Sequence, residues 1–376
     1  MHATSRAQRT RRMIIAAFLL GSLIVGCMPP DAEAAGASVP EPPANHAKGV
    51  SLIDVASGRI IYSKQGDEPM LIASLTKIMT AIVAIEHGRL DDQVTVSKRA
   101  AGKEGSSIYL KAGEKIQLRN LIYGLMLRSG NDAATAIAEH VGGSVEGFAF
   151  LMNKKAAEIG LSNSQYMNPH GLDEPGHYAS ANDLAKLTAY ALHNPEFRTI
   201  VSTRVRTAPN PHDPWDYKWV NKNKMLQMYE GADGVKTGYT KKALRCLVSS
   251  ATRNGQQLVV VTLNDGDDWA DHRKLLDYGF AHYPLTKVAS AGDPVLVAAE
   301  AGKLSNDFRY PLAAGEREQL TAMYENQDLR KAVYALGYRG WMNYYLNGKR
   351  IGSVSVVVSD HGIGRAEGQA GKKGAG

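Results

Sequence analysis

The chain has 376 residues, a formal net charge of +7 and only two cysteines, and 44% of its residues are hydrophobic. A chain of this length is too long for one small core and predicts two domains. Two cysteines exclude a disulfide framework, and no cluster of residues has the spacing of a metal site, so we expect no cofactor and no metal. Nothing in the sequence resembles a nucleic-acid-binding motif, and we expect no nucleic-acid partner.

The first 34 residues predict an export signal. Met1–Arg12 contains four arginines, and Met13–Gly26 is an apolar run that is too short for a comfortable transmembrane span. We therefore expect an extracytoplasmic protein and assign residues 1–34 to a signal peptide.

Two ways of processing this signal remain open. Ile24–Cys27 resembles a lipobox, and cleavage before Cys27 would leave a lipid-bearing cysteine that associates the chain with a membrane. Ala32–Ala34 is an A-x-A site, and cleavage there would leave a chain that begins at Ala35. Residues 35–48 contain three prolines and predict a flexible tether in either case.

A serine and a lysine stand three residues apart at the start of a predicted helix. In Ser74-Leu75-Thr76-Lys77, followed by the apolar run Thr76–Glu86, the two side chains share one helix face. A serine hydroxyl becomes nucleophilic when a base takes its proton, and a lysine serves as that base if burial and nearby positive charge lower its pKa. The pattern predicts Ser74 as nucleophile and Lys77 as base, although in isolation it would indicate only a capping serine and a solvated lysine.

A second motif, Ser129-Gly130-Asn131, lies between the helical runs Leu118–Leu127 and Asp132–His140. We expect Gly130 to allow a tight turn that directs both polar side chains into one cleft. Ser129 would then relay a proton from the lysine base to a leaving amine, and Asn131 would hold a substrate amide. The structural alternative is an ordinary interhelical turn with a helix cap.

A third motif, Lys236-Thr237-Gly238, opens a predicted run of hairpins over Val235–Thr240, Leu244–Ala251 and Gln257–Leu263. A substrate peptide can add to an edge strand of this kind, with Gly238 permitting close approach and Lys236 and Thr237 binding a carboxylate. The charge of Lys236 would also lower the pKa of the lysine base. The backbone N–H groups of Ser74 and Tyr239 would form an oxyanion hole. On its own the motif would indicate only a polar strand end.

These elements predict an α+β fold, an antiparallel sheet with an inserted helical cluster, in which the motifs meet at the junction. The strands Ser51–Asp54 and Arg59–Ser63 precede the cluster, which extends to about His193 and includes a capping-box variant at Ser180–Asp183. The helix Ala270–Tyr283 then returns the chain to the sheet.

The three motifs in this order resemble those of the D-alanyl-D-alanine carboxypeptidases, the low-molecular-weight penicillin-binding proteins. Further similar segments are Asn168–Leu172, Gly176–Tyr178, Asp183–Ala185, Asp233–Val235 and Leu275–Phe280. The resemblance is close over residues 45–285. It implies a β-lactamase/DD-peptidase-like catalytic domain over residues 49–284, which removes D-alanine from a peptidoglycan stem peptide and is acylated by β-lactam antibiotics. It also implies a location in the cell wall or at the membrane.

One segment departs from the family pattern. Asn221-Lys222-Asn223 falls where members often carry an Asn-Arg-Asn-like segment near the substrate carboxylate. A lysine there lacks the bidentate fork of arginine. His170 and His177 flank a loop in the same region, and we expect structural roles for them rather than zinc binding.

Two other functions share these motifs. A serine β-lactamase would need a deacylating glutamate between the second and third motifs, and Glu174 is the candidate. The sequence around Glu174 lacks the E-x-x-L-N pattern, and Gly130 before Asn131 favours the peptidase. A non-catalytic penicillin or peptidoglycan sensor would use the same cleft, and peptide turnover distinguishes it from an enzyme.

From Pro284 the pattern changes to short strands, which predict a small β-rich C-terminal domain over residues 285–360. The expected strands are Pro294–Ala298, Phe308–Pro311 and a hairpin of Trp341–Leu346 with Lys349–Val358, whereas Glu316–Leu336 is predicted partly helical. Residues 361–376 contain six glycines and predict a disordered tail. We expect a chain that ends near Pro284 to remain folded.

Overall fold

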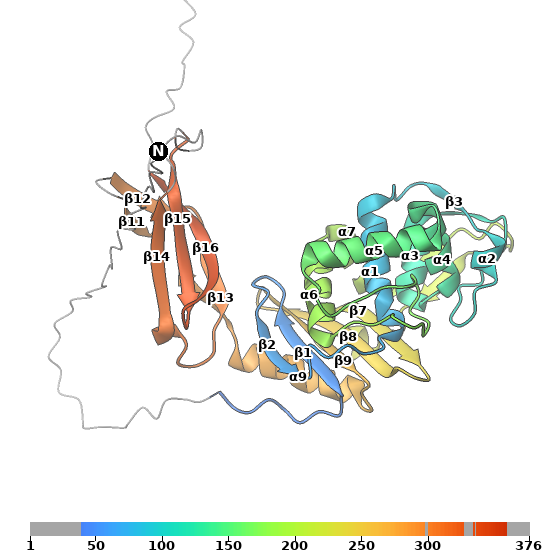
Figure 1. The fold of residues 1–376 in the computed structure, drawn as a ribbon, viewed down its shortest axis with the longest axis horizontal. Helices are drawn as coiled ribbons and strands as arrows, with labels where there is room; N and C mark the ends of the chain where they lie inside the picture. The colour runs from blue at the N-terminus through green and yellow to red at the C-terminus, as the bar shows by residue number, and fades with distance from the viewer. Residues whose placement is uncertain (1–38, 298–299, 327–333, 335, 359–376) are drawn as a thin grey trace, which may run out of the picture. The chain divides into compact units, whose positions relative to one another are not determined.

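The computed structural model describes residues 39–297, 300–326, 334 and 336–358. The predicted signal with Cys27 and the predicted tail 361–376 lie outside the described residues. Contacts divide the described chain into a larger unit, residues 39–286 with 309–314, and a smaller unit, residues 287–308 with 315–358 (Figure 1). Within the described part of the chain, no helix has the length and apolar character needed to cross a bilayer.

A five-stranded antiparallel sheet forms the centre of the larger unit, and its strand order is β2-β1-β9-β8-β7. The predicted strands are confirmed, and β7, which carries the third motif, is an edge strand. The bounds are β1 Gly49–Asp54, β2 Ile60–Lys64, β7 Ala232–Thr240, β8 Leu244–Arg253 and β9 Gln256–Leu263.

The helical cluster lies between β2 and β7 in the chain, as predicted. Its helices are η1 Ala73–Leu75, α1 Thr76–His87, α2 Lys98–Ala101, α3 Leu118–Tyr123, η2 Gly124–Arg128, α4 Asn131–Gly142, α5 Val145–Ile159, α6 Ala181–Leu192, α7 Pro195–Ser202 and α8 Met225–Met228. Two small sheets join them, β3 Gln93–Thr95 with β4 Lys115–Gln117, and β5 Val205–Ala208 with β6 Tyr217–Val220. The side chain of Ser180 caps α6 by accepting from the N–H of Asp183 at 3.1 Å, which confirms the predicted cap.

Both faces of the central sheet are covered. Side chains of a strand point alternately to the two faces, so Val259 and Val261 of β9 belong to the core shared with the helical cluster. Leu258 and Val260 pack with Leu275 of α9, Asp268–His282. Figure 1 shows α9 and the helical cluster on opposite faces of the sheet.

Two local predictions for the larger unit need correction. The helix expected over Leu118–Leu127 ends at Tyr123, because residues 124–128 form a π-helical turn that leads into the second motif. The described part of the expected tether, residues 39–48, packs on the unit: Val39 and Ala47 join the core beneath α9, and Tyr278 donates to the carbonyl of Pro40 at 3.0 Å. Proline content alone did not reveal this packing.

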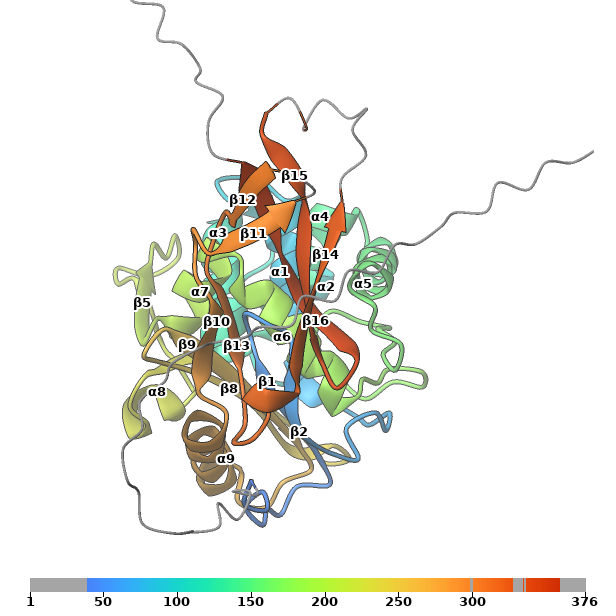
Figure 2. The ribbon, with the colours of Figure 1, turned by 90° about the vertical axis from the view of Figure 1, so that its left-hand side faces the viewer.

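The smaller unit is a five-stranded antiparallel sheet, seen in Figure 2. Its order is β11-β12-β16-β15-β14, with bounds β11 Pro294–Val297, β12 Glu300–Leu304, β14 Leu320–Asn326, β15 Tyr338–Leu346 and β16 Lys349–Val358. The predicted hairpin across Asn347-Gly348 is confirmed, because both residues have positive φ and Leu346 pairs with Lys349. The strand β14 lies in the segment predicted partly helical, where pairing with β15 overrides local propensity.

The chain crosses between the units more than once. After β10, Leu285–Ala289, it enters the smaller unit, and it returns through β13, Phe308–Pro311, which forms a two-stranded sheet with β10. Residues 309–314 belong to the larger unit, where the guanidinium of Arg59 donates to the carbonyl of Pro311 at 2.7 Å. A chain that ended near Pro284 would lack residues 309–314 of the larger unit, and that it remains folded stays a prediction.

Candidate active site

Ser74 lies in the 3₁₀ turn η1, immediately before α1. Ala73 has a φ of +46°, a conformation that is costly for a residue with a Cβ atom. The hydroxyl of Thr76 donates to the carbonyl of Ala73 at 2.9 Å and stabilises the turn. As the three-residue spacing predicts, the Nζ of Lys77 lies 3.0 Å from the Oγ of Ser74.

The Nζ of Lys77 is completely surrounded by protein. It donates to the Oδ1 of Asn131 at 2.7 Å and to the carbonyl of His170 at 2.6 Å. Burial lowers the pKa of Lys77 well below its usual value, and the charges of Lys236 and Lys222 lower it further, while Asp132 opposes them. A deprotonated amine at this position keeps two N–H donors and gains a lone pair. The two oxygen acceptors match those donors, which leaves the lone pair for the hydroxyl of Ser74.

The orientation of Asn131 is fixed from its other end. Its Nδ2 donates to the carbonyl of Glu104 at 2.7 Å, so Oδ1 faces Lys77. The structure shows Asn131 holding Lys77, and the contact of Asn131 with a substrate amide stays a prediction.

The turn of the second motif is built differently from the expectation. Ser129 itself has the left-handed φ of +65°, whereas Gly130 has a φ of −59°. Gly130 is required for space, because a Cβ there would lie 2.8 Å from the Oδ1 of Asp132. Ser129 is buried, and the turn joins η2 and α4, both of which pack against α1.

Asp132 is a residue whose importance the sequence reasoning missed. Its buried carboxylate accepts from the hydroxyl of Ser107 at 2.6 Å and from the N–H groups of Ile108 and Leu110 at 3.0 and 3.1 Å. These bonds hold the loop that supplies the carbonyl of Glu104 to Asn131. The only available sequence signal was an acidic residue in the first turn of a helix.

The strand β7 brings the third motif against the nucleophile. A Cβ on Gly238 would lie 3.2 Å from the backbone nitrogen of Ser74, so only glycine permits this approach without displacement. Lys236 is buried, and its Nζ donates to the carbonyl of Thr237 at 2.8 Å. Burial, with a contribution from Lys222, lowers the pKa of Lys236 to about 7. Tyr239 is exposed.

Lys222 contributes a third cationic group. Its side chain is exposed, its Nζ lies 3.4 Å from the Oγ of Ser106, and its backbone N–H donates to the carbonyl of Leu127. Burial and the charge of Arg128 lower its pKa. Three lysines with lowered pKa values, at 77, 222 and 236, therefore influence one another, and one of them contacts Ser74. This combination is typical of a functional site rather than of a structural ion-pair network.

The loop 168–178 supports the site from the side of α1. The N–H of Met167 donates to the Nδ1 of His177 at 3.0 Å, which leaves the proton on Nε2, and Nε2 donates to the hydroxyl of Thr76 at 2.7 Å. Thr80 donates to the carbonyl of Pro169 at 2.6 Å. These contacts place the carbonyl of His170 on Lys77, and they give both nitrogens of His177 a structural role.

Three buried histidines predict a loss of stability in mild acid. Burial lowers the pKa of His170 to about 2, of His272 to about 3 and of His177 to about 4, whereas an unfolded histidine titrates near 6.5. Between about pH 6.5 and 4 the unfolded chain therefore binds more protons than the folded chain. As the pH is lowered through this range, the free energy of unfolding decreases by up to about 4 kcal/mol per pH unit.

This acid effect can be measured by urea unfolding at about pH 7.5, 6 and 5. His272→Gln is expected to reduce the slope of stability against pH by about a third, since it removes one of three protons taken up on unfolding. His87→Gln, at an exposed position, serves as the control and should leave the slope unchanged. Equal stability at pH 7.5 and 5 would contradict the prediction.

The arrangement of Ser74, Lys77, Ser129 and the lysine of an edge strand is the one expected of a serine hydrolase. A profile of the Peptidase_S11 family, described as D-alanyl-D-alanine carboxypeptidase, matches residues 36–267. The D-alanyl-D-alanine carboxypeptidase DacC of Escherichia coli is 32% identical over 91% of this chain and 90% of its own length. DacF of Bacillus subtilis is 37% identical over 65% of this chain, and the chain spans about two thirds of DacF, 65% of its length.

Solved structures agree with this assignment. The structure of penicillin binding protein 5 from Haemophilus influenzae has a TM-score of 0.69 and 31% identity, over 85% of this chain and 98% of that one. The Streptomyces K15 DD-transpeptidase has a TM-score of 0.61 and 34% identity, over 64% of this chain and 99% of that one. The chain belongs to the D-alanyl-D-alanine carboxypeptidase family, and the β-lactamase and sensor alternatives are not favoured.

Proposed function

We propose that this serine hydrolase removes the terminal D-alanine from peptidoglycan stem peptides through an acyl-enzyme on Ser74, and that β-lactam antibiotics acylate the same serine. The observation that supports this most directly is the pair of fixed acceptors on Lys77, the amide of Asn131 and the carbonyl of His170. They leave the lone pair of a neutral lysine directed at the nucleophile, which is the geometry that a general base requires.

Acylation would proceed in two proton transfers. Lys77 takes the proton of Ser74 as the hydroxyl oxygen attacks the carbonyl carbon of the D-Ala-D-Ala bond. Collapse of the tetrahedral intermediate then breaks the C–N bond, and the leaving amine receives that proton through Ser129. Release of D-alanine opens the site to water, which Lys77 deprotonates for hydrolysis of the ester.

The substrate would bind along the free edge of β7. Because β8 occupies only one edge of β7, the backbone groups of the other edge are open to an extended peptide. The N–H groups of Ser74 and Tyr239 would hold the oxyanion. Thr237, Gly238 and the protonated form of Lys236 would receive the terminal carboxylate, which raises the pKa of Lys236 by its own charge.

Glu174 is engaged elsewhere in the structure. Its Oε2 accepts from the Nδ2 of Asn168 at 2.8 Å, and Asn168 in turn holds the N–H of Gly171 at 2.8 Å. A carboxylate used to shape the loop is a poor candidate for activating water. We therefore expect slow deacylation of β-lactams, and Glu174→Gln should not change that rate.

The test uses the full chain with a peptide that ends in D-Ala-D-Ala and a matched peptide that ends in D-Ala-L-Ala. D-alanine should be released from the first and no amino acid from the second. After treatment with penicillin, mass spectrometry of peptide fragments should place a single adduct on Ser74. An adduct on another residue, or binding of the peptide without release of D-alanine, would overturn the proposal.

Gly171 is expected to be essential for the geometry of the nucleophile. Its φ is +82°, and a Cβ there would lie 1.8 Å from the carbonyl oxygen of Ala73. Gly171→Ala should therefore lower the free energy of unfolding by about 1–2 kcal/mol, because alanine is strained in the left-handed conformation. Its Cβ atom would also displace Ala73. Gly176 has the same φ of +82°, but its Cβ would meet nothing nearer than 3.6 Å. Gly176→Ala should lower the melting temperature by the strain alone and leave acylation unchanged, whereas Gly171→Ala should lower both.

We also propose that the protein acts outside the cytoplasm after removal of an export signal, either free or held through a lipidated Cys27. The basic and apolar pattern of residues 1–26 supports export. Mass spectrometry of the mature N-terminus distinguishes the two sites: a diacylglyceryl group on Cys27 supports the lipoprotein, and an unmodified Ala35 supports A-x-A cleavage. A retained Met1 would exclude both.

The smaller unit carries none of the three motifs, and we propose that it positions the larger, catalytic unit on the cell wall. Met323 and Trp341, on the paired strands β14 and β15, are about half exposed. Met323→Ala with Trp341→Ala should slow D-alanine release from intact wall and leave release from a soluble peptide unchanged. Equal rates on intact wall would remove this role.

A further inference from the structure

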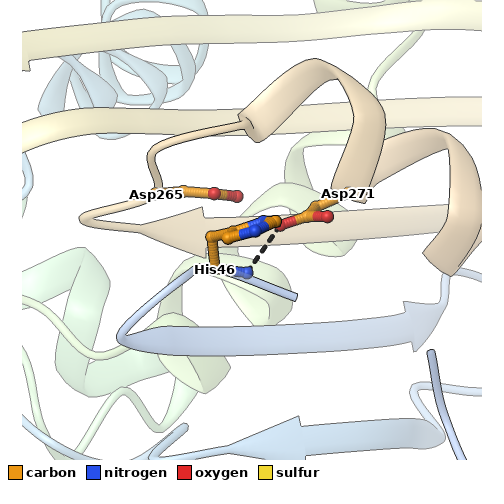
Figure 3. A group of neighbouring side chains, drawn as sticks. All are labelled: His46, Asp265 and Asp271. Atoms are coloured by element: carbon orange, nitrogen blue, oxygen red, sulfur yellow. Dashed lines mark hydrogen bonds and ion pairs between the residues drawn. The ribbon is translucent and has the colours of Figure 1, made fainter. Parts of the chain in front are cut away.

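A second cluster of polar side chains lies on the opposite face of the central sheet, beside α9. His46 comes from the segment before β1, Asp265 from the turn after β9, and Asp271 from the first turns of α9. One donor atom of each residue lies within 4.8 Å of those of the other two. Figure 3 shows both carboxylates beside the imidazole ring of His46. The mechanism proposed for Ser74 uses none of these residues.

Asp265 is the unusual member of the cluster. It is 1% exposed, and its Oδ2 has no hydrogen-bond partner, while Oδ1 accepts from the N–H of Asp267 at 3.0 Å. A buried carboxylate oxygen without a partner is costly, and a second buried carboxylate beside it increases that cost. A cation between the two carboxylates would remove both penalties.

The backbone already holds the imidazole in place. The N–H of His46 donates to the Oδ2 of Asp271 at 2.7 Å, and the N–H of Lys48 donates to the carbonyl of Leu263 at 3.0 Å. The Nδ1 of His46 and the same oxygen of Asp271 form a hydrogen bond of 3.0 Å, which a bound ion would replace. Two ligands bonded to one ion at about 2.1 Å lie about 3.0–3.4 Å apart. This pair therefore has the separation of neighbouring ligands before any ion binds.

We propose that His46, Asp265 and Asp271 bind one divalent transition-metal ion, with Zn²⁺ the best match. One imidazole nitrogen and two carboxylate oxygens suit zinc better than Ca²⁺ or Mg²⁺, which prefer larger sets of oxygen ligands. The side chain of His46 is exposed on its outer side, so water completes the coordination. Lys274 contacts the other oxygen of Asp271, Oδ1, at 3.3 Å, so the ion would use the lone pair of Oδ2 that does not accept from the N–H of His46.

The ion would fasten the N-terminal segment to the catalytic unit. Residues 39–48 precede β1, and Val39, Ala47 and the carbonyl of Pro40 already contact the larger unit. A metal ligated by His46 from this segment and by two aspartates near α9 would connect the segment to the end of β9. The site is thus structural, and it is independent of the reaction at Ser74.

The test is titration of the full, metal-free chain with ZnCl₂ by calorimetry, followed by thermal unfolding with and without the metal. We expect one ion per chain and a rise in melting temperature that EDTA reverses. His46→Ala and Asp265→Asn should each weaken binding by more than about tenfold. His87→Ala, an exposed histidine at the end of α1, is the matched control and should bind as the wild type does.

Two further measurements make the result decisive. Zinc should slow proteolytic cleavage within residues 39–48, and His46→Ala should abolish that protection, whereas penicillin acylation of Ser74 should be the same in both proteins. His46 is exposed and its variant is expected to fold, so it remains informative if Asp265→Asn does not fold. No binding of zinc, or equal binding by the wild type and His46→Ala, would overturn the proposal.

Discussion

Replacing Ser74 with alanine is expected to abolish penicillin acylation and to reduce D-alanine release by about 10⁴-fold or more. The hydroxyl is the only side-chain group of Ser74 that the proposed reaction uses, and alanine keeps the backbone N–H. Loss of the nucleophile therefore leaves only the contributions of binding and the oxyanion hole. The fold should be unaffected, because the turn at Ala73 is held by Thr76 rather than by the side chain of Ser74. The measurement is steady-state release of D-alanine together with intact-protein mass after penicillin treatment.

The control for this prediction is Ser202→Ala. Ser202 is an exposed serine at the end of α7, and its hydroxyl donates to the carbonyl of Arg198 at 2.8 Å. That variant should retain full acylation and activity. Residual acylation of Ser74→Ala at the wild-type rate would identify a different nucleophile.

Much of the catalytic unit could be predicted because its signals are local. Alternating apolar residues marked the strands, and the 3.6-residue period marked α1 and α4. The spacing of Ser74 and Lys77 is a property of one helical turn, so it was sufficient to place their side chains in contact. The Asn347-Gly348 turn likewise fixed the hairpin of the smaller unit.

The features that were missed depend on contacts between distant segments. Lys77 donates to the carbonyl of His170, 93 residues away. Every residue has a backbone carbonyl, so the sequence does not indicate which one accepts. The strand β14 forms because β15 pairs with it, against a partly helical prediction for its segment. His46 and Asp271 are 225 residues apart, so no spacing rule could bring the proposed metal ligands together.

Lys77→Ala is expected to lower the rate of acylation by about 10²–10⁴-fold through loss of the general base. In the mechanism proposed for the wild type, Lys77 acts as a neutral base and Lys236 binds the carboxylate in its protonated form. The rate should therefore rise as pH increases through the lowered pKa of Lys77, and fall at higher pH as Lys236 loses its proton. Because the two groups interact, the limbs of this bell-shaped profile report apparent values for the pair.

A substitution at Lys222 should shift both limbs of the pH profile while Lys77 and Lys236 stay unchanged. Its positive charge lowers the pKa of Lys77 and of Lys236, so its removal in Lys222→Met makes both easier to protonate. Both limbs of the profile of kcat/KM against pH should move to higher pH. Lys218→Met, an exposed lysine on β6, removes the same charge from a position outside the site and should leave the profile in place. A shift to lower pH, or an equal shift in both variants, would mean that Lys77 is not the group whose deprotonation limits acylation.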